Sequence, residues 1–112
     1  MPQDRFQLLN ATFHCQSADG QAKARGRLEG LEVLCVLARS TAKGHPNRVI
    51  QKHLVENGVL EKQGGVFVFL KDFPFHKPSR AASTVMGRNA NGWKEWKTDN
   101  GQTLDQLAGR GQ

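Results

Sequence analysis

The stretch FHKPSRAASTVMGRNANGWKEWKTDNGQTL, residues 75–104, holds the clearest start and stop signals of the chain. Pro78 disfavours helix at the residue before it and is tolerated beside a helix start. Ser79 can accept a hydrogen bond from a free amide one turn later, so we expect it to be the N-cap of a helix that continues to Met86. Gly87 is typical of the left-handed residue that ends a helix. The stretch is therefore predicted to begin with one short helix.

The second half of this stretch predicts a turn, a strand and a last helical turn. Asn91 and Gly92 are typical turn residues, and segment 93–97 has the aromatic and charged residues of a strand. Residues 99–101 predict a hairpin turn. The spacing of residues 103–106 fits a capping box, in which a threonine hydroxyl and a glutamine amide each satisfy a backbone N–H near a helix start.

The rest of the chain predicts five strands. Apolar and polar residues alternate over 9–15 and 22–28, which is the period of a half-buried strand. The run 33–38 is apolar on both faces and predicts the most buried strand. Segments 59–60 and 66–70 are rich in branched and aromatic residues and predict two more strands.

One further helix is predicted between these strands. A loop is expected over 40–47, and Pro46 or Asn47 is expected to begin a helix that Gly58 ends. The residues that recur there at helical spacing are Val49, Ile50, His53 and Leu54. The predicted fold is α+β, a mainly antiparallel sheet of about five or six strands with two short helices and a C-terminal helical turn.

Length and composition indicate one globular domain over residues 1–112, with the 75–104 stretch as its most distinctive part. The chain has 38% hydrophobic and 23% charged residues, so it is not typical of a disordered segment. No segment approaches the roughly 20 apolar residues of a membrane span, and the N-terminus lacks the pattern of a secretory signal. We therefore expect a cytoplasmic protein without a membrane partner.

The charge balance favours a polyanionic partner. The chain carries 16 Lys and Arg against 10 Asp and Glu, a formal net charge of +6, and residues 71–97 carry six cations against two anions. Lys23, Arg25 and Arg27 would line the polar face of the predicted strand 22–28. That row is either the solvated face of an edge strand or a secondary basic binding face.

The two tryptophans invite a base-stacking hypothesis, because aromatic side chains beside cations can form a platform for exposed bases. Positions three apart on a strand face opposite sides, so at least one tryptophan is expected in the core. Trp93 is the better candidate for the core. Trp96, between Glu95 and Lys97, fits the core and the surface about equally.

Chemistry-bearing residues show no catalytic or metal-binding pattern. His14 and Cys15 would point to opposite faces of a strand, and the other histidines have no ligand spacing. No acidic pair is matched to a nucleophile or base, so we expect no enzymatic activity, no metal and no cofactor. Cys15 and Cys35 could reach each other as a disulfide, but two buried thiols are the favoured interpretation.

The 75–104 stretch resembles the bacterial DUF4357 family, whose members often follow GIY-YIG endonuclease domains, and it is similar to the RAMA domains of restriction enzymes and adenine methylases. The residues that carry the resemblance are Pro78, Ser79, Ala81, Ala82, Gly87, Arg88, Asn91, Gly92, Trp93, Trp96, Lys97, Gly101, Thr103 and Leu104. The chain departs from the family pattern at His76, Lys77 and Arg80, which add charge at the helix entrance and would suit a phosphate contact. The chain has no tyrosine, so the GIY-YIG nuclease centre is not in it.

The resemblance implies a non-catalytic nucleic-acid-binding module, with DNA as its partner, linked to a restriction, modification or repair enzyme such as a nuclease or methyltransferase. The predicted binding residues are Arg80, Arg88, Asn91, Lys94, Trp96 and Lys97. Asn91 could instead be only a turn residue. On this view, reversing Arg80 and Arg88 should weaken binding more than reversing Lys23 and Arg25. The alternative is a protein-interaction module with the Trp96 surface as its apolar anchor.

Overall fold

The computed structural model describes residues 11–29, 33–44 and 49–108, which build an α+β fold. Its sheet contains β1 (Phe13–Gln16), β2 (Lys23–Leu28), β3 (Leu34–Val36), β4 (Thr41–Lys43), β5 (Leu60–Gln63), β6 (Val66–Phe69) and β7 (Phe73–Phe75). Its helices are α2 (Val49–Glu56), α3 (Pro78–Met86), α4 (Gly92–Glu95) and α5 (Leu104–Ala108). The predicted class is confirmed, with seven strands in place of five or six.

Strand β2 is the centre of the sheet. The hydrogen-bonded order is β5-β6-β4-β2-β3-β7, and β1 pairs with β2 off this path. β1 lies along one edge of β2, while β3 and β4 follow one another along the other edge, and every pairing is antiparallel. The chain between β3 and β4 turns at Ala38 and Arg39.

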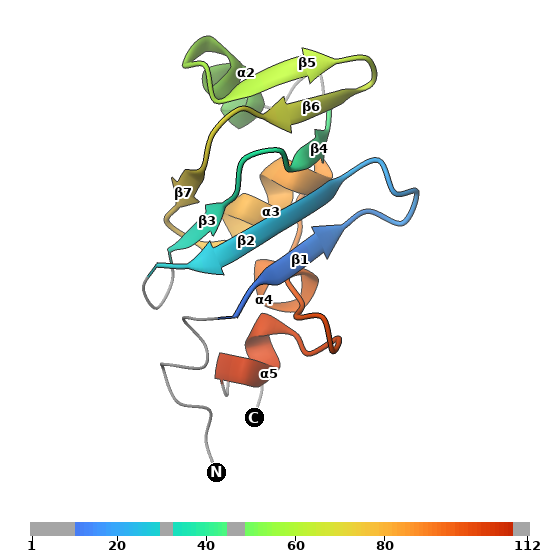
Figure 1. Ribbon diagram of the computed structural model, residues 1–112, viewed down its shortest axis with the longest axis vertical. Helices are drawn as coiled ribbons and strands as arrows, with labels where there is room; N and C mark the ends of the chain where they lie inside the picture. Colours follow the sequence, from blue (N-terminus) through green and yellow to red (C-terminus); the bar gives the residue numbers. More distant parts are fainter. Residues whose placement is uncertain (1–10, 30–32, 45–48, 109–112) are drawn as a thin grey trace.

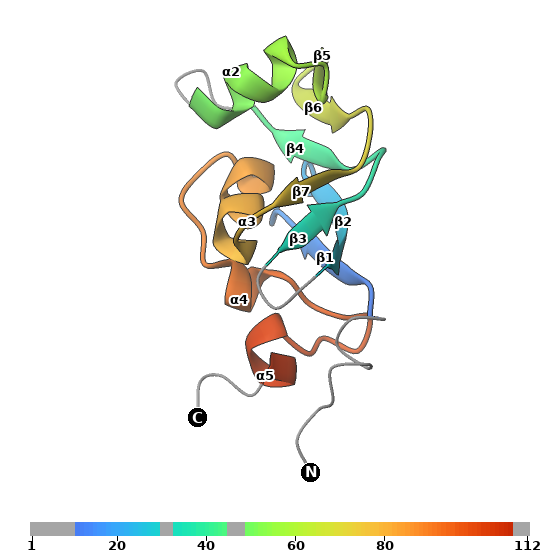
Figure 2. The same ribbon diagram turned by 90° about the vertical axis from the view of Figure 1, so that its left-hand side faces the viewer.

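The helices cover one face of this sheet and leave the other open. Figure 2 shows α2, α3 and α4 on the same side of the strands, and Figure 1 views the sheet with α3 behind it. In β2, the residues on the helix side are Ala24, Gly26 and Leu28, all buried, and the alternate residues are exposed. Along the described part of the chain, no helix covers the second face, which we call the open face.

Two strands were not predicted. β4 falls inside the expected loop 40–47, because its pairing with β2 and β6 overrides a sequence of small and polar residues. β7 contains Pro74, which argues against a strand, but among the described strands β7 lies at the edge and pairs with β3 alone, where a proline is tolerated. Residues 45–47 of the expected loop and the predicted helix start lie outside the described residues.

The predicted strand over 93–97 is wrong, because residues 93–95 belong to the helix α4 and Lys97 forms isolated bridges after it. Asn91 is its N-cap, and the side-chain oxygen accepts a hydrogen bond from the Trp93 amide at 3.0 Å. Ser79 is not the N-cap of α3 either. Lys77 holds that position, Pro78 is the first helical residue, and the Ser79 hydroxyl bonds elsewhere.

Other local signals are confirmed. Gly87 ends α3 with a φ of 69° and donates its N–H to Ser83 O. The capping box of α5 forms, since Thr103 N donates to Gln106 Oε1 at 2.9 Å and Gln106 N donates to Thr103 Oγ1 at 3.1 Å. The predicted hairpin turn also closes, with the Gly101 amide bonded to the Thr98 carbonyl.

The helix α2 turns a different face inward from the one predicted. Leu54 is buried, but Val49 is 66% exposed and His53 is also exposed. The unexpected buried residue is Gln51, whose Nε2 donates to Lys43 O at 2.7 Å and to Thr84 O at 2.9 Å. This amide joins α2 to β4 and α3, so a polar side chain replaces part of the apolar face that the spacing predicts.

Candidate nucleic-acid interface

Trp96 is a core residue, so the prediction that it packs on a sugar or base is wrong. Its exposed fraction is 0%, and its Nε1 donates to Pro78 O at 3.1 Å. A Cβ at Gly26 of β2 would lie 3.3 Å from Cζ3 of the tryptophan ring. Trp93 is half-buried and packs against the core. The helical geometry of α4 removes the strand alternation on which the expectation for Trp96 relied.

The residues around Trp96 form a tight connection between α3 and the segment that follows it. A Cβ on Gly92 would lie 2.1 Å from the Pro78 carbonyl carbon, and Gly92 N donates to Ser79 Oγ at 2.9 Å. Ala90 N donates to Ser83 Oγ at 2.9 Å. We call this set the motif core: Pro78, Ser79, Ser83, Gly92 and Trp96. The most distinctive residues of the sequence therefore hold the fold together.

The N-terminus of α3 has fewer free backbone amides for an anion than the sequence suggests. Arg80 N and Ala81 N both donate to the Lys77 carbonyl, at 3.1 and 3.2 Å, so two of the first amides are already bonded. Gly92 packs directly against Pro78 at the same end. The expected phosphate contact at this helix entrance therefore has little support from the backbone.

The other predicted residues of the helical layer are dispersed or engaged. Arg88 Nη2 lies 3.7 Å from Glu95 Oε2, and Arg88 Nη1 donates to the carbonyl of the next residue at 3.1 Å. Asn91 serves as the N-cap of α4. Arg80 on α3 and Lys94 on α4 are exposed.

Lys97 belongs to the open face and not to the helical layer. Its backbone pairs with His14, through His14 N to Lys97 O at 2.6 Å and Lys97 N to His14 O at 2.9 Å. His14 in turn lies opposite Arg25 in the β1–β2 register. Directly paired residues of antiparallel strands present their side chains on the same face, so Lys97, His14 and Arg25 form one row across the sheet.

The open face therefore gathers cations from three parts of the chain. The secondary basic face predicted on β2 forms as expected, because Lys23, Arg25 and Arg27 are all exposed on one side of that strand. We call the complete set the cationic face: Lys23, Arg25, Arg27, Arg39 and Lys97. Within the described ranges, no ion pair joins any of these five to a carboxylate.

Two other residues of this face are bonded to carboxylates. Lys43 Nζ lies 2.9 Å from Asp19 Oδ2, and His14 Nε2 lies 2.7 Å from Asp99 Oδ1. These pairs flank the cationic face and leave its positive charge concentrated along β2.

Arg39 is a member of this face that the sequence did not predict. It lies in the turn between β3 and β4 with a φ of 73°, and it is the described non-glycine residue with a positive φ. That conformation is typical of glycine or asparagine, so an arginine gives no local signal of it. Its position beside β2 also depends on the strand order, which the sequence does not reveal.

The two cysteines are buried free thiols, as expected. Burial, and secondarily the nearby Glu95, raises the pKa of Cys15 to about 12. Burial raises the pKa of Cys35 to about 11, with smaller contributions from the carboxylates of Glu29 and Asp72 that Arg27 partly opposes. Both thiols therefore stay protonated at neutral pH, and neither is a nucleophile there.

Acidic, histidine and cysteine side chains do not gather elsewhere into a metal-binding group of three or more, as far as the chain is described. Over the same residues, no helix is long and apolar enough to cross a membrane.

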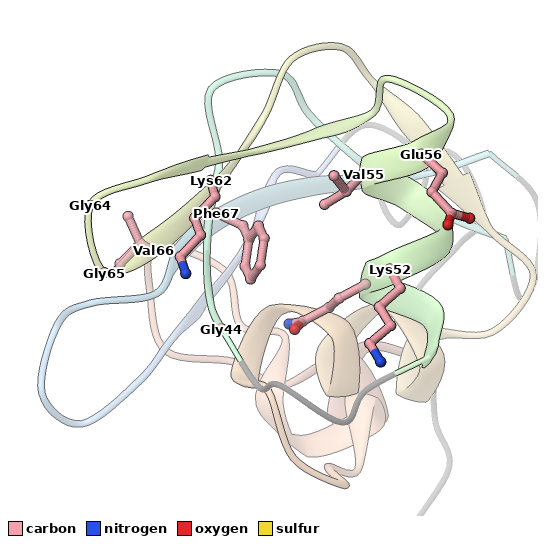
Figure 3. A pocket seen from close by; sticks show the side chains of 10 residues that line it. Gly44, Lys52, Val55, Glu56, Lys62, Gly64, Gly65, Val66 and Phe67 are labelled. Atoms are coloured by element: carbon pink, nitrogen blue, oxygen red, sulfur yellow. The ribbon is translucent and has the colours of Figure 1, made fainter.

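One hollow lies away from the cationic face. It has a volume of about 740 Å³ and separates α2 from the β5–β6 hairpin (Figure 3). The Phe67 ring projects into it from β6, and the side chain of Lys52 lies at its α2 side. None of the predicted site residues is among the described residues that line it.

The sequence comparisons agree with the architecture. A family model described as Domain of unknown function (DUF4357) matches residues 13–108, which run from the start of β1 to the end of α5. The chain belongs to the DUF4357 family, as the resemblance of its 75–104 stretch predicted. No curated protein and no solved structure gives a significant match.

Proposed function

We propose that this protein is a non-catalytic nucleic-acid-binding module that contacts DNA through the cationic face. The observation that carries the proposal is the grouping of five exposed cations, without ion-pair partners in the described residues, on a face that no described helix covers. Such a surface suits phosphate contacts, which supply most of the sequence-independent affinity for DNA.

The association with a restriction, modification or repair enzyme is part of the same proposal. It rests on the enzyme domains that often accompany the families that the 75–104 stretch resembles. The net charge of +6 supports only the choice of an anionic partner. The alternative of a protein-interaction module loses its anchor, because Trp96 is buried.

The test is fluorescence anisotropy with a short labelled DNA duplex over a salt series. If all five cations of the face neutralise phosphates, the plot of log affinity against log salt should have a slope of about −4 to −5. A duplex that does not bind even at low salt would overturn the proposal.

A pair of variants locates the interface. The double variant Lys23→Gln, Lys97→Gln removes two charges from the cationic face, and the matched control Arg80→Gln, Lys94→Gln removes two exposed charges from the helical layer. We expect the first to reduce the salt slope by about 2 and the second to leave it nearly unchanged. The sequence favoured Arg80 over Lys23 and also favoured Lys97, so this order differs from it for the first two residues, and the opposite result would return the interface to α3 and α4.

A further inference from the structure

A second, smaller hollow lies within the cationic face, where β2 passes the turn between β3 and β4. Its volume is about 590 Å³. The residues that line it are Thr12, Arg25, Arg27, Leu37, Ala38, Arg39 and Asp72. Three arginines and one aspartate thus line one hollow, with an excess of two formal positive charges.

The turn that carries Arg39 is held firmly in place. Arg39 N donates to Phe69 O and Phe69 N donates to Ser40 O, both at 2.8 Å, so the end of β6 clamps the turn. The single carboxylate of the hollow has a structural bond of its own, since Asp72 Oδ1 accepts from Ala38 N at 2.7 Å.

The same turn is joined to the backbone of Arg25. Leu37 N donates to Arg25 O at 2.8 Å, and Arg25 N donates to the buried Ser40 Oγ at 3.0 Å. The main chains beneath Arg25 and Arg39 are therefore fixed relative to each other, so two of the three arginine side chains extend from fixed backbone positions.

The conformation of Arg39 is unfavourable for its residue type. A side chain with a Cβ is strained at a φ of 73°, where glycine is not. Strained residues are concentrated at functional sites, and here the strained residue is an exposed arginine beside two others. The strain and the charge cluster are independent observations that point to the same place.

We propose that this hollow is a phosphate-binding site that seats one phosphodiester of a DNA duplex, an inference that rests on the proposed function and names where the backbone docks. A guanidinium group can bind two phosphate oxygens at once. Three arginines around one hollow can therefore hold a single phosphate group, which separate cations on a flat surface would not.

The face favours a duplex over a single strand. Proteins that hold single strands stack the bases on exposed aromatic side chains. In the described strands, the aromatic residues on the sheet are Phe13, Phe67, Phe69, Phe73 and Phe75, and each is buried or half-buried on the helix side. The open face therefore offers positive charge without aromatic side chains for base stacking. It is suited to contact the phosphate backbone of a duplex and not its bases.

The decisive variant is Arg39→Gly, because it removes the guanidinium group and relieves the strained backbone at once. We expect its melting temperature to equal or exceed that of the wild type, while its affinity for the duplex falls roughly tenfold at low salt and the salt slope drops by about 1. Arg39→Lys keeps the charge but not the planar fork, and we expect an intermediate affinity. Arg80→Gln is the matched control, and its affinity should stay within about twofold of the wild type.

The outcomes separate the two proposals. If the wild type and Arg39→Gly bind the duplex equally well, the proposed phosphate-binding site is overturned and the proposed function still holds. Tighter binding of a single strand than of the duplex would overturn the duplex assignment.

If the wild type binds no DNA at low salt, the proposed function fails. A titration with inorganic phosphate then tests whether the hollow binds phosphate. Shifts of the Ala38 and Ser40 amide signals in the wild type that vanish in Arg39→Gly would support a phosphate site. Unchanged amide signals would overturn it.

Discussion

The motif core and the cationic face lie on opposite sides of one sheet and differ in what their residues do. The motif core contains the proline, tryptophan, glycine and first serine that carry the family resemblance. Its side chains are buried or hydrogen-bonded to nearby backbone groups. The cationic face consists mostly of residues outside the 75–104 stretch, and its side chains are exposed. The most distinctive residues of the sequence therefore specify the structure, while a strand with no distinctive motif supplies the surface available to a ligand.

Lys97 connects the two regions along the chain. It follows Trp96 directly in the chain, yet its backbone pairs with β1 and its side chain joins the row on the open face. The comparison can therefore be tested by substitutions that should act on stability alone or on binding alone.

The largest loss of stability should come from Trp96→Ala. Removing a fully buried indole from the motif core should lower the free energy of unfolding by about 3–5 kcal/mol, a large part of the 5–15 kcal/mol of an ordinary domain. Urea unfolding followed by circular dichroism measures it. A loss below about 1 kcal/mol would mean that the core tolerates the cavity and that the motif core is not essential.

Gly92→Ala should rank second. The added methyl would lie 2.1 Å from the Pro78 carbonyl carbon, so α3 and α4 must separate, at a cost of about 1–3 kcal/mol. The control is Gly65→Ala, because a Cβ at Gly65 would contact nothing within 4 Å. Equal stabilities of the two variants in the same urea experiment would contradict the close approach at Gly92.

Ser83→Ala should have a smaller effect of about 1–2 kcal/mol. It removes the acceptor of the half-buried Ala90 amide, which loses its bond of 2.9 Å. The control is Gln63→Ala, which deletes an exposed bond to Glu61 of 2.8 Å and should cost less than about 0.5 kcal/mol. If thermal unfolding finds the two variants alike, the segment after α3 is not anchored by the serine hydroxyl.

The smallest change in stability is expected on the cationic face. The double variant Lys23→Gln, Arg27→Gln should leave the free energy of unfolding within about 0.5 kcal/mol of the wild type, because both side chains are exposed and have no ion pair in the described residues. Its affinity for a DNA duplex should fall nonetheless. Destabilisation by more than about 1 kcal/mol would show that these cations serve the fold.

Much of the fold could be predicted because its signals are local. The alternation over 22–28 correctly placed three cations on one side of β2, and the caps at Gly87 and at Thr103 are as predicted. β4 and β7 could not be predicted, since each is a strand only through its partners.

The candidate site was harder to predict for the same reason. The secondary basic face was found from its period of two, but its link to Lys97 depends on pairing between distant segments. Trp96 was misplaced because Asn91 caps a helix where a strand was expected. Arg39 gave no signal at all, since its left-handed backbone and its neighbours are set by the tertiary structure.

Pro74 in β7 affects whether copies of the protein can associate through this edge of the sheet. A proline in an edge strand turns its missing N–H outward, so an incoming strand would find no donor at the middle of this border. Sheets whose edge strands keep all their free N–H groups can pair edge to edge with other copies and aggregate. The border formed by β7 resists such pairing, which helps to keep separate copies of the protein from aggregating through that edge.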